Sequence, residues 1–381
     1  MIKCVIWDLD NTLLTGVYLE SPDQPPAADP VLAGVVAELS GRGILQAIAS
    51  RNPPEAGRYA QQATGHDFAA VQCGWGAKSA SVAAIMTELD LTADAVAFVD
   101  DDALERAEVS FAQPAILVLA PQDMTDAATW PQFSPAVVTE EARRRGELYL
   151  QRRARQEEAQ AFGGSRDDFL RYLRTRVVIG QAASADVPRL HELSVRTHQF
   201  NSAGTEVSEA DFAALLGSPS HRVITVRLSD RFGDDGLVGA CVLVTAAAGE
   251  PGDGATVTEQ AAIPARMGTR PDPDAWDMPL LMMSCRAMGR GVIEALLAWV
   301  CRAARASGAS QVRMPCVINS PNVPLRIALT GAGFRASTPA QGEPAATREA
   351  ATGPRTAWYV RRLDESLSPL PDWAHSAQES P

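Results

Sequence analysis

Short apolar segments alternate with helical segments over residues 1–135, and this alternation constrains the fold more than any other feature. The expected elements are strands at 5–9, 45–50, 95–101 and 115–120, and helices at 30–43 and 79–91. Apolar strands that are separated by helices are typical of a parallel sheet with helices on both faces. We therefore predict an α/β chain that opens with a doubly wound parallel sheet.

Length and composition narrow the class of protein. The chain has 381 residues, which is more than one average core holds, so we expect two domains. Its net charge of -12 argues against a general nucleic-acid binder, because phosphate contacts need clustered Lys and Arg. No apolar run is long enough for a membrane span, and the N-terminal run is short and ends in acids, unlike a secretory signal. We expect neither a nucleic-acid partner nor a membrane partner.

The six cysteines are scattered along the chain and form no CxxC pair. This pattern indicates neither a zinc site nor a disulfide framework. Free thiols are typical of a reducing compartment, so we expect a cytoplasmic protein.

Polar residues follow the expected strands of the first domain where those strands end. These residues are Asp8, Asp10 and Thr12, then Ser50, Lys78, and the acids Asp100, Asp101 and Asp102. Ligands of open α/β sheets bind at the carboxyl ends of the strands, so these side chains should meet. Two carboxylates, a hydroxyl, an ammonium and further acids suit phosphoryl transfer, in which one acid attacks phosphorus and another protonates the leaving oxygen. Hard oxygen ligands favour Mg²⁺ as the metal.

DLDNT at residues 8–12, the strand-end Ser50, Lys78 and FVDDD at 98–102 together resemble the four motifs of the haloacid dehalogenase (HAD) superfamily. The resemblance implies that Asp8 is the nucleophile and Asp10 the general acid and base. The implied phosphate-binding residues are Thr12, Ser50, Arg51, Asn52 and Lys78. The implied Mg²⁺ ligands are Asp8, Asp10 through its carbonyl, and Asp100 or Asp101. The alternative is a degenerate domain that only binds, and the complete set of acids argues against it.

Residues 136–176 are predicted to form a helical connector after a HAD-like domain at 1–135. Residues 143–176 contain ten Arg, no Lys and five acids, with a break at Gly163 and Gly164. One interpretation is a solvated link between domains. The other is an approach for an anionic substrate or an acidic carrier protein, with Arg152, Arg153 and Arg155 as the docking residues.

A second domain is predicted at 177–363, followed by a tail at 364–381. Its expected strands are 176–183, 221–228, 236–247, 279–287 and 311–318, with a long helix at 293–308. Residues 248–275 are rich in Gly, Pro and Asp and are interpreted as a long hairpin insertion. The stretch RFGDDGLVGA is interpreted as a hairpin turn, with Asp234 and Asp235 as turn residues.

RAMGRG at residues 286–291 lies between an expected strand and the long helix. Glycines there would let backbone N–H groups approach an anion at the start of a helix. The stretch resembles the (R/Q)xxGx(G/A) motif of GNAT-type acyltransferases, and residues 319–334 resemble the helix that follows in that fold. The resemblance implies a mixed α/β domain that grips a phosphopantetheine arm through Arg286, Gly289, Arg290, Gly291 and Asn319.

Two further residues are candidate catalytic groups. Cys285 precedes this glycine loop, where Arg286 and a helix start would favour the thiolate, although cysteines near strand ends are commonly packing residues. His198, in the polar stretch THQFN, is a candidate base for a thiol, although a lone His is more often a surface or packing residue. Both alternatives stay open.

The whole chain resembles the FkbH-like family of polyketide pathways, on KCVIWDLDNTL, FVDDDALERAEV, THQFN, RFGDDGLVG and MSCRAMGRGV. The resemblance implies a glyceryl transferase and phosphatase that uses D-1,3-bisphosphoglycerate, a small phosphorylated three-carbon acid. It implies loading of the glyceryl unit as a thioester on the phosphopantetheine of an acyl carrier protein, for extender units or tetronate rings. Cys285 or the carrier thiol would accept the acyl group.

Three other functions remain open at this point. One is a phosphatase whose GNAT-like half only docks a carrier protein. Another is an acyltransferase that uses acyl-CoA, with the HAD-like half as a separate or regulatory activity. The last is a carrier-protein adaptor without chemistry, against which the complete set of HAD-like acids argues.

Overall fold

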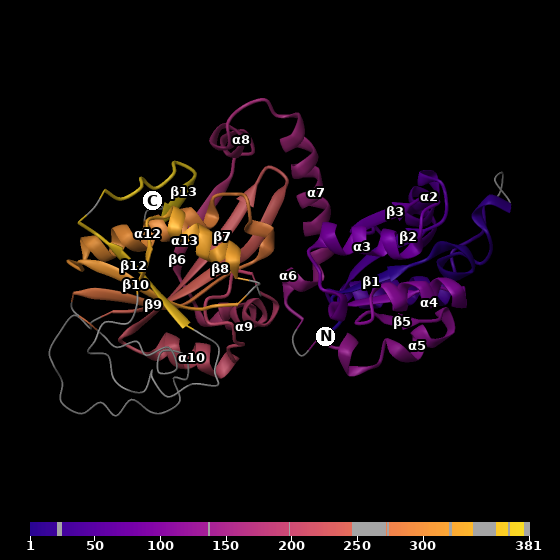
Figure 1. Cartoon of the computed structure of the whole chain (residues 1–381), viewed down its shortest axis with the longest axis horizontal. Coiled ribbons are helices and arrows are strands. Elements are labelled where there is room, and N and C mark those ends of the chain that lie inside the picture. Colours follow the sequence, from indigo (N-terminus) through magenta and orange to yellow (C-terminus); the bar gives the residue numbers. More distant parts are fainter. Residues whose placement is uncertain are drawn as a thin grey trace. The chain divides into compact units, whose positions relative to one another are not determined.

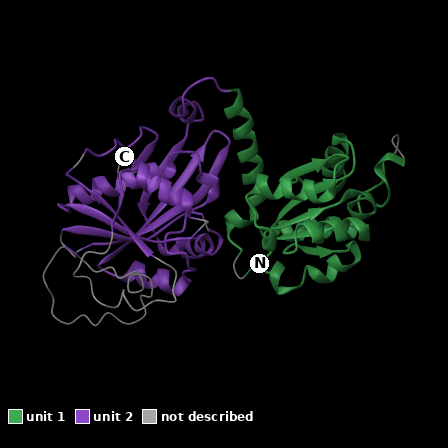
Figure 2. Ribbon diagram, in the orientation of Figure 1, with its two compact units in different colours: residues 1–161 green, residues 162–381 purple. Residues whose placement is uncertain are grey.

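The computed structural model divides the chain into two compact units, Met1–Ala161 and Phe162–Pro381 (Figure 2). The structure describes residues 1–20, 25–135, 138–197, 199–245, 272, 274–319, 322–337, 356–364 and 366–376. The predicted insertion at 248–275 lies outside the described residues except for 272, 274 and 275, and the predicted tail is described at 364 and 366–376.

The first unit contains a five-stranded parallel sheet with β1 at its centre (Figure 1). The strand order is β3-β2-β1-β4-β5. The strands are β1 (Cys4–Trp7), β2 (Leu45–Ser50), β3 (Ala70–Cys73), β4 (Val96–Val99) and β5 (Leu117–Leu119). The helices are α1 (Pro30–Gly41), α2 (Pro54–Thr64), α3 (Lys78–Leu89), α4 (Ala103–Ala112), α5 (Met124–Ala127), α6 (Glu140–Arg143) and α7 (Arg145–Ala161).

Both faces of this sheet are covered, which explains why β1 and β4 consist of buried apolar residues. Alternate residues of β1 belong to two separate buried clusters, because successive side chains of a strand point to opposite faces. Helices α1, α2 and α5 contribute to one cluster, and α3 and α4 to the other. The prediction of a doubly wound parallel sheet is confirmed.

The Arg-rich stretch belongs to both units. Helix α7 ends at Ala161, and α8 (Arg166–Tyr172) begins after the break at Gly163 and Gly164. Ser165 caps α8 by accepting a hydrogen bond from the Asp168 amide. Two helices therefore flank the two glycines.

The second unit contains an eight-stranded mixed sheet, so the predicted mixed α/β class is confirmed. The strand order is β11-β12-β10-β9-β8-β7-β6-β13. The strands are β6 (Arg176–Gln181), β7 (His221–Asp230), β8 (Gly233–Val244), β9 (Ala275–Met283), β10 (Gln311–Val317), β11 (Arg335–Ser337), β12 (Thr356–Arg362) and β13 (Ala374–Ser376). The helices besides α8 are α9 (Val187–Arg196), α10 (Glu209–Gly217), α12 (Val292–Ala306) and α13 (Val323–Gly331).

Helices cover both faces of the mixed sheet as well. Residues of α12 and α13 share one buried cluster with the sheet, and residues of α9 and α10 share another. None of the helices in the described ranges is long and apolar enough to cross a membrane.

The sheet of the second unit is forked between β9 and β10. These parallel strands pair only at Ala275–Asp277 with Gln311–Arg313. Farther along, Ser202 bridges the fork: its amide donates to the Leu281 carbonyl at 2.9 Å, and its carbonyl accepts from the Val317 amide at 2.9 Å. The segment that contains Ser202 thus forms backbone hydrogen bonds with β9 and β10 where these two strands no longer pair.

Candidate active site

Three neighbouring parallel strands place polar side chains at one edge of the first sheet. Trp7, at the end of β1, is opposite Ile48 of β2 and Val99 of β4. The Asp8 amide extends this register by donating to the Val99 carbonyl at 2.9 Å. Asp8 and Asp100 consequently follow adjacent strands, and both side chains are buried.

Lys78, the first residue of α3, lies at the centre of the site. Its Nζ lies 2.6 Å from Asp8 Oδ1 and 3.1 Å from Asp100 Oδ2. It also lies 2.7 Å from Glu105 Oε2 and donates to the Ala49 carbonyl at 3.2 Å. The ammonium, whose side chain is 2 % exposed, is therefore shared by three carboxylates.

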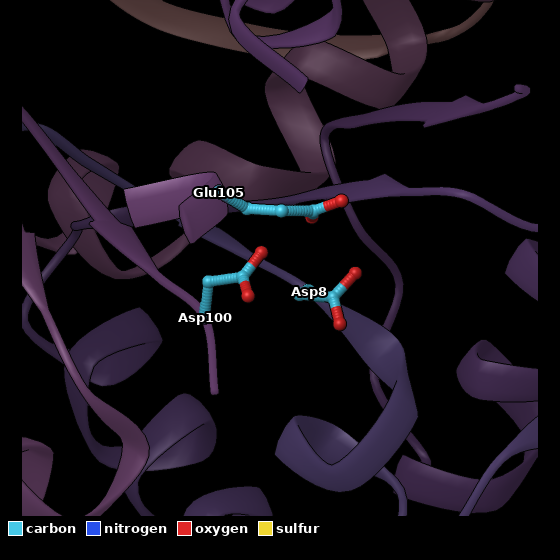
Figure 3. Close-up of side chains that lie close together, drawn as sticks. All are labelled: Asp8, Asp100 and Glu105. Atoms are coloured by element: carbon cyan, nitrogen blue, oxygen red, sulfur yellow. The ribbon is translucent and has the colours of Figure 1, made fainter. Parts of the chain in front are cut away.

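Glu105 is the residue that the sequence analysis missed. It lies in the first turn of α4, three residues after the N-cap Asp102, and its carboxylate converges with those of Asp8 and Asp100 (Figure 3). The signal was present, because a helix that begins beside a strand end directs its first turn toward the same site. It was overlooked because an acid in a first helical turn is common for electrostatic reasons alone.

Charge within this cluster is unbalanced. Burial raises the pKa of Asp8, and the nearby Lys78 ammonium lowers it in part. Burial, followed by the Asp8 charge, raises the pKa of Asp100 to about 7. The carboxylates raise the pKa of Lys78, outweighing the burial that alone would lower it. The Lys78 ammonium and the Arg51 guanidinium, which pairs with Glu105, leave one of the three acids without a matching cation, and a bound cation would compensate that charge.

The carboxylates fit a hard divalent cation. Ligand atoms of Asp8, Asp100 and Glu105 all lie within 4.8 Å of one another. Oxygen donors of this kind suit Mg²⁺, which is usually held by a few carboxylates together with water and substrate phosphate. Asp101, the other candidate ligand, has an exposed side chain, and its carbonyl accepts from Arg106 at 2.8 Å. Glu105 is therefore better placed than Asp101 to join Asp8 and Asp100.

Asp10 lies apart from the Lys78 cluster and has its own partners. Its Oδ1 accepts from the Tyr18 amide at 2.9 Å, and its Oδ2 accepts from Asn52 Nδ2 at 3.0 Å. Asn11 follows at a φ of 50°, in the left-handed region that Asn tolerates better than most residues. This turn separates the Asp10 carboxylate from that of Asp8.

The predicted phosphate-binding residues differ in their surroundings. Ser50 and Asn52 are buried together and hydrogen-bonded to each other. Thr12 is buried, and its hydroxyl has no hydrogen-bond partner among the described residues. Arg51 is half exposed, with its Nε 3.0 Å from Glu105 Oε1 and its second guanidinium nitrogen 3.7 Å from Glu108. Thr12 thus retains a free hydroxyl, whereas Arg51 is engaged by acids of α4.

In the second unit, Cys285 lies two residues after the end of β9. It is partly exposed and begins a short 3-10 turn that Ser284 caps. Cys4, Cys241, Cys301 and Cys316 are buried instead. His198, the other candidate catalytic group of this unit, lies outside the described residues.

Arg290 of the glycine loop is bound within the protein. Its guanidinium pairs with Asp230 at 2.6 Å and also with Asp235. Both carboxylates are fully buried, and the Arg290 side chain is 9 % exposed. Asp235 is thus a buried ion-pair partner and not a turn residue. Asp234 also lies within β8, opposite Ser229, and accepts from the Gly236 amide, so the turn consists of residues 231 and 232.

The structure describes the other residues that were predicted to bind phosphopantetheine. Gly289 and Gly291 both have positive φ, and the Gly289 carbonyl accepts from Arg166 of α8 at 3.0 Å. A Cβ at Gly291 would lie 2.8 Å from the Trp373 ring, whereas one at Gly289 would meet nothing within 4 Å. Arg286 is buried beside Ser284, and Asn319 caps the Asn322 amide at 2.9 Å. Packing against Trp373 thus explains why residue 291 is Gly, whereas no packing contact explains the Gly at position 289.

Comparison with known proteins gave structural similarities only. No protein-family model matches the chain, and no curated protein matches it. One similar structure is the N-terminal part of a Bacteroides fragilis protein, which contains a phosphatase domain complexed with Mg. It has 23 % identity and a TM-score of 0.30, and the alignment covers 33 % of this chain and 39 % of that one.

Two acetyltransferases are also similar. One, assigned to the GNAT family, is from Desulfovibrio desulfuricans: identity 16 %, TM-score 0.33, coverage 49 % of this chain and 99 % of that one. The other is the ribosomal-protein-S18-alanine N-acetyltransferase of Escherichia coli: identity 12 %, TM-score 0.31, coverage 48 % and 90 %. Since every TM-score is below 0.5, the function has to be judged from the side chains of the two units.

Proposed function

We propose that the first unit is a HAD-type, Mg²⁺-dependent phosphatase. The observation that carries the proposal is the buried Lys78 ammonium, which contacts Asp8, Asp100 and Glu105 at the carboxyl edge of a parallel sheet. A purely structural ion pair has no reason to lie at the ligand-binding edge of a sheet. This cluster lies at that edge, where three carboxylates converge around the ammonium.

The proposed reaction uses two acids in succession. Asp8 attacks phosphorus and forms an aspartyl-phosphate, while the bond to the leaving oxygen breaks and Asp10 supplies its proton. Asp10 then takes a proton from water, which attacks the aspartyl-phosphate and releases inorganic phosphate. Lys78 holds Asp8 in place and offers positive charge to the phosphoryl oxygens. Mg²⁺ held by Asp8, Asp100 and Glu105 would add further positive charge there.

For the whole chain we propose glyceryl transfer coupled to phosphate removal, as in the FkbH-like family. The substrate would be D-1,3-bisphosphoglycerate and the acceptor the phosphopantetheine thiol of an acyl carrier protein. The phosphate on carbon 1 is an acyl phosphate, which a thiolate displaces to form a thioester. The phosphate on carbon 3 is an ordinary ester and needs a site like that of Asp8. The partly exposed Cys285 is the candidate thiol that holds the acyl group.

A specific observation favours a second candidate, a phosphatase whose second unit only docks a carrier protein. Arg290, which the motif offers to an anion, is neutralised by Asp230 and Asp235. Gly291 is required by the contact with Trp373. These two residues therefore support the fold of the unit and give no separate support for acyl transfer.

The test is intact-protein mass spectrometry after incubation with Mg²⁺ and freshly generated 1,3-bisphosphoglycerate, with and without a phosphopantetheinylated carrier protein. Wild type, Cys285→Ala and Asp8→Asn are compared. We expect a phosphoglyceryl or glyceryl adduct on the wild type that Cys285→Ala lacks and that passes to the carrier. Asp8→Asn should form the adduct but keep the carbon-3 phosphate. Phosphate release without any adduct on enzyme or carrier would favour the phosphatase with a docking unit.

The Arg-rich segment remains the proposed docking face for an acidic carrier protein, but Arg155 is no longer one of its docking residues. Arg155 is buried, so its charge is poorly placed for a partner. Arg153 is half exposed and pairs with Glu157 at 3.1 Å. Arg153→Glu should weaken carrier binding, and unchanged affinity in a binding titration would exclude this face.

A further inference from the structure

Asn52 is held rigidly beside the site by the sequence around it. It follows Ser50, the last residue of β2, and precedes Pro53 and Pro54 at the start of α2. A residue before proline is restricted to extended backbone, so α2 cannot begin earlier and Asn52 stays in the strand-end loop. Its side chain is buried, with only 1 % of the residue exposed.

Both amide hydrogens of Asn52 are already used. Its Nδ2 donates to Asp10 Oδ2 at 3.0 Å and to Ser50 Oγ at 3.1 Å. An Asn amide has two hydrogens, so no donor remains for a phosphoryl oxygen. The opposite amide orientation is unfavourable, because it would place Oδ1 against the Asp10 carboxylate.

The remaining atom of the amide is unsuited to phosphate as well. Asn52 Oδ1 is buried and has no hydrogen-bond partner among the described residues. It is an acceptor, and a phosphate dianion offers acceptors only. The phosphate-binding role that the sequence suggests for Asn52 is therefore not the one that its contacts favour.

Asp10 is held from two sides. Asn52 binds one carboxylate oxygen, and the Tyr18 amide binds the other at 2.9 Å. The Tyr18 ring packs against Tyr59 of α2, with ring centroids 5.6 Å apart. The Tyr59 hydroxyl donates to the carbonyls of Pro25 and Pro26, each at 3.0 Å. Elements on both sides of Asp10 thus fix the orientation of its carboxylate.

We propose that Asn52 is a positioning residue that orients Asp10 for proton transfer to the leaving group, and that it does not bind phosphate. The inference rests on the proposed phosphatase activity. In the first step the bond from Asp8 to phosphorus forms, the ester P–O bond breaks, and the Asp10 proton moves to the leaving oxygen. In the second step Asp10 accepts a proton from the attacking water, and the Asp8–phosphorus bond breaks.

This role predicts a dependence on the leaving group. General acid catalysis contributes roughly 100- to 10,000-fold, and it matters most for poor leaving groups such as alkoxides. A nitrophenolate leaves with little help from an acid. Loss of Asp10 orientation should therefore slow alkyl phosphates far more than p-nitrophenyl phosphate, whereas loss of a phosphate contact should slow both alike.

The experiment measures kcat and KM of the full chain with saturating Mg²⁺ on p-nitrophenyl phosphate, phenyl phosphate and 3-phosphoglycerate. For Asn52→Ala we expect kcat/KM, which reports only the steps up to departure of the leaving group, to fall about tenfold or more for the alkyl ester and less than about threefold for the nitrophenyl ester. Inhibition by inorganic phosphate should stay unchanged. Asn52→Leu, which keeps the branched shape of the side chain, replaces the Ala variant if the latter does not fold.

Two controls make the outcome decisive. In an Asp10→Asn background, Asn52→Ala should cost nothing further, because residues that act as one unit are not additive. Thr12→Ala removes a free hydroxyl beside the site and should affect all three esters equally. Equal losses of kcat/KM on every ester for Asn52→Ala, or a raised phosphate inhibition constant, would overturn the inference while leaving the phosphatase intact. A wild type that hydrolyses none of the esters would instead overturn the proposed function, and the inference with it.

Discussion

Each unit buries one cation among carboxylates, and the two clusters differ in their location and in their other partners. Lys78 in the first unit contacts three acids at the carboxyl edge of a parallel sheet. Arg290 in the second unit contacts two acids, Asp230 and Asp235, which are fully buried. The first cluster also includes the half-exposed Arg51, which pairs with Glu105, whereas the charged side chains of the second are at most 9 % exposed.

The comparison shows how a candidate active site can be distinguished from a structural ion pair. Burying a charge is costly unless it is paired, so both clusters need their partners. In the second unit the planar guanidinium satisfies two carboxylates from the β7–β8 hairpin and ties it to the loop before α12. In the first unit three carboxylates converge at the edge of the sheet where ligands bind, so a cation can bind among them and a phosphate can bind to that cation.

The largest effect is expected from Asp8→Asn. Removing the nucleophile should lower phosphate release at least about 1,000-fold. The matched change in the other cluster, Asp235→Asn, should leave phosphate release within about threefold of wild type, because separate sites act independently. Inorganic phosphate released from p-nitrophenyl phosphate is the measurement. If both variants lost activity equally, the distinction between the two clusters would fail.

Arg290→Ala should have the opposite pattern, a loss of stability without a loss of phosphatase activity. It leaves Asp230 and Asp235 buried without their cation, which typically costs about 3–5 kcal/mol. Urea denaturation followed by tryptophan fluorescence measures the free energy of unfolding. Arg166→Ala removes an exposed ion pair with Glu294 and should cost less than about 1 kcal/mol. An Arg290→Ala protein as stable as Arg166→Ala would show that the buried pair is dispensable.

Glu105→Gln tests whether the third carboxylate serves the chemistry. We expect kcat to fall about 10- to 100-fold and Mg²⁺ to bind more weakly, because Glu105 orients Lys78 and is placed to hold the metal. Isothermal titration with Mg²⁺ and steady-state kinetics are the measurements. The control is Glu108→Gln, which alters the more exposed acid that contacts Arg51 and Ser79. Identical behaviour of the two variants would place Glu105 outside the site.

The smallest expected effect is a difference in stability between variants of the two glycines in the loop before α12. Gly289→Ala and Gly291→Ala both force Ala into the left-handed region, at about 1–2 kcal/mol each. Gly291→Ala also directs its Cβ at Trp373, so it should cost about 1 kcal/mol more than Gly289→Ala. Thermal unfolding of the two variants measures the difference. Equal costs would mean that Trp373 yields easily and that packing does not explain Gly291.

Sequence patterns predicted the backbone of the first unit well. Apolar strands and intervening helices led to the parallel sheet, and the helices expected at 30–43 and 79–91 correspond to α1 and α3. Helix α4, whose first turn carries Glu105, was not predicted. The residues DDDALERAEV after β4 contain the N-cap Asp102 and the start of this helix.

Hydrogen-bonding partners were predicted less well than positions. Asn52 was expected to bind phosphate, and its contacts instead join it to Asp10 and Ser50. Asp235 was expected in a turn, and it is the buried partner of Arg290. Whether Asn or Asp serves a turn, a ligand or a distant ion pair depends on which residue lies within about 3 Å, and local sequence does not report that distance.

The order of strands and polar residues along the chain was enough to predict that Asp8, Ser50, Lys78 and Asp100 meet, because parallel strands bring their carboxyl ends to one edge of a sheet. The partners of the charged groups became apparent only in the folded chain. The Arg290 motif was as distinct in the sequence as the Asp8 motif, yet its cation is paired with acids 60 and 55 residues away. Long-range packing sets these pairings, and the location of each cluster in its sheet separates the candidate active site from the structural ion pair.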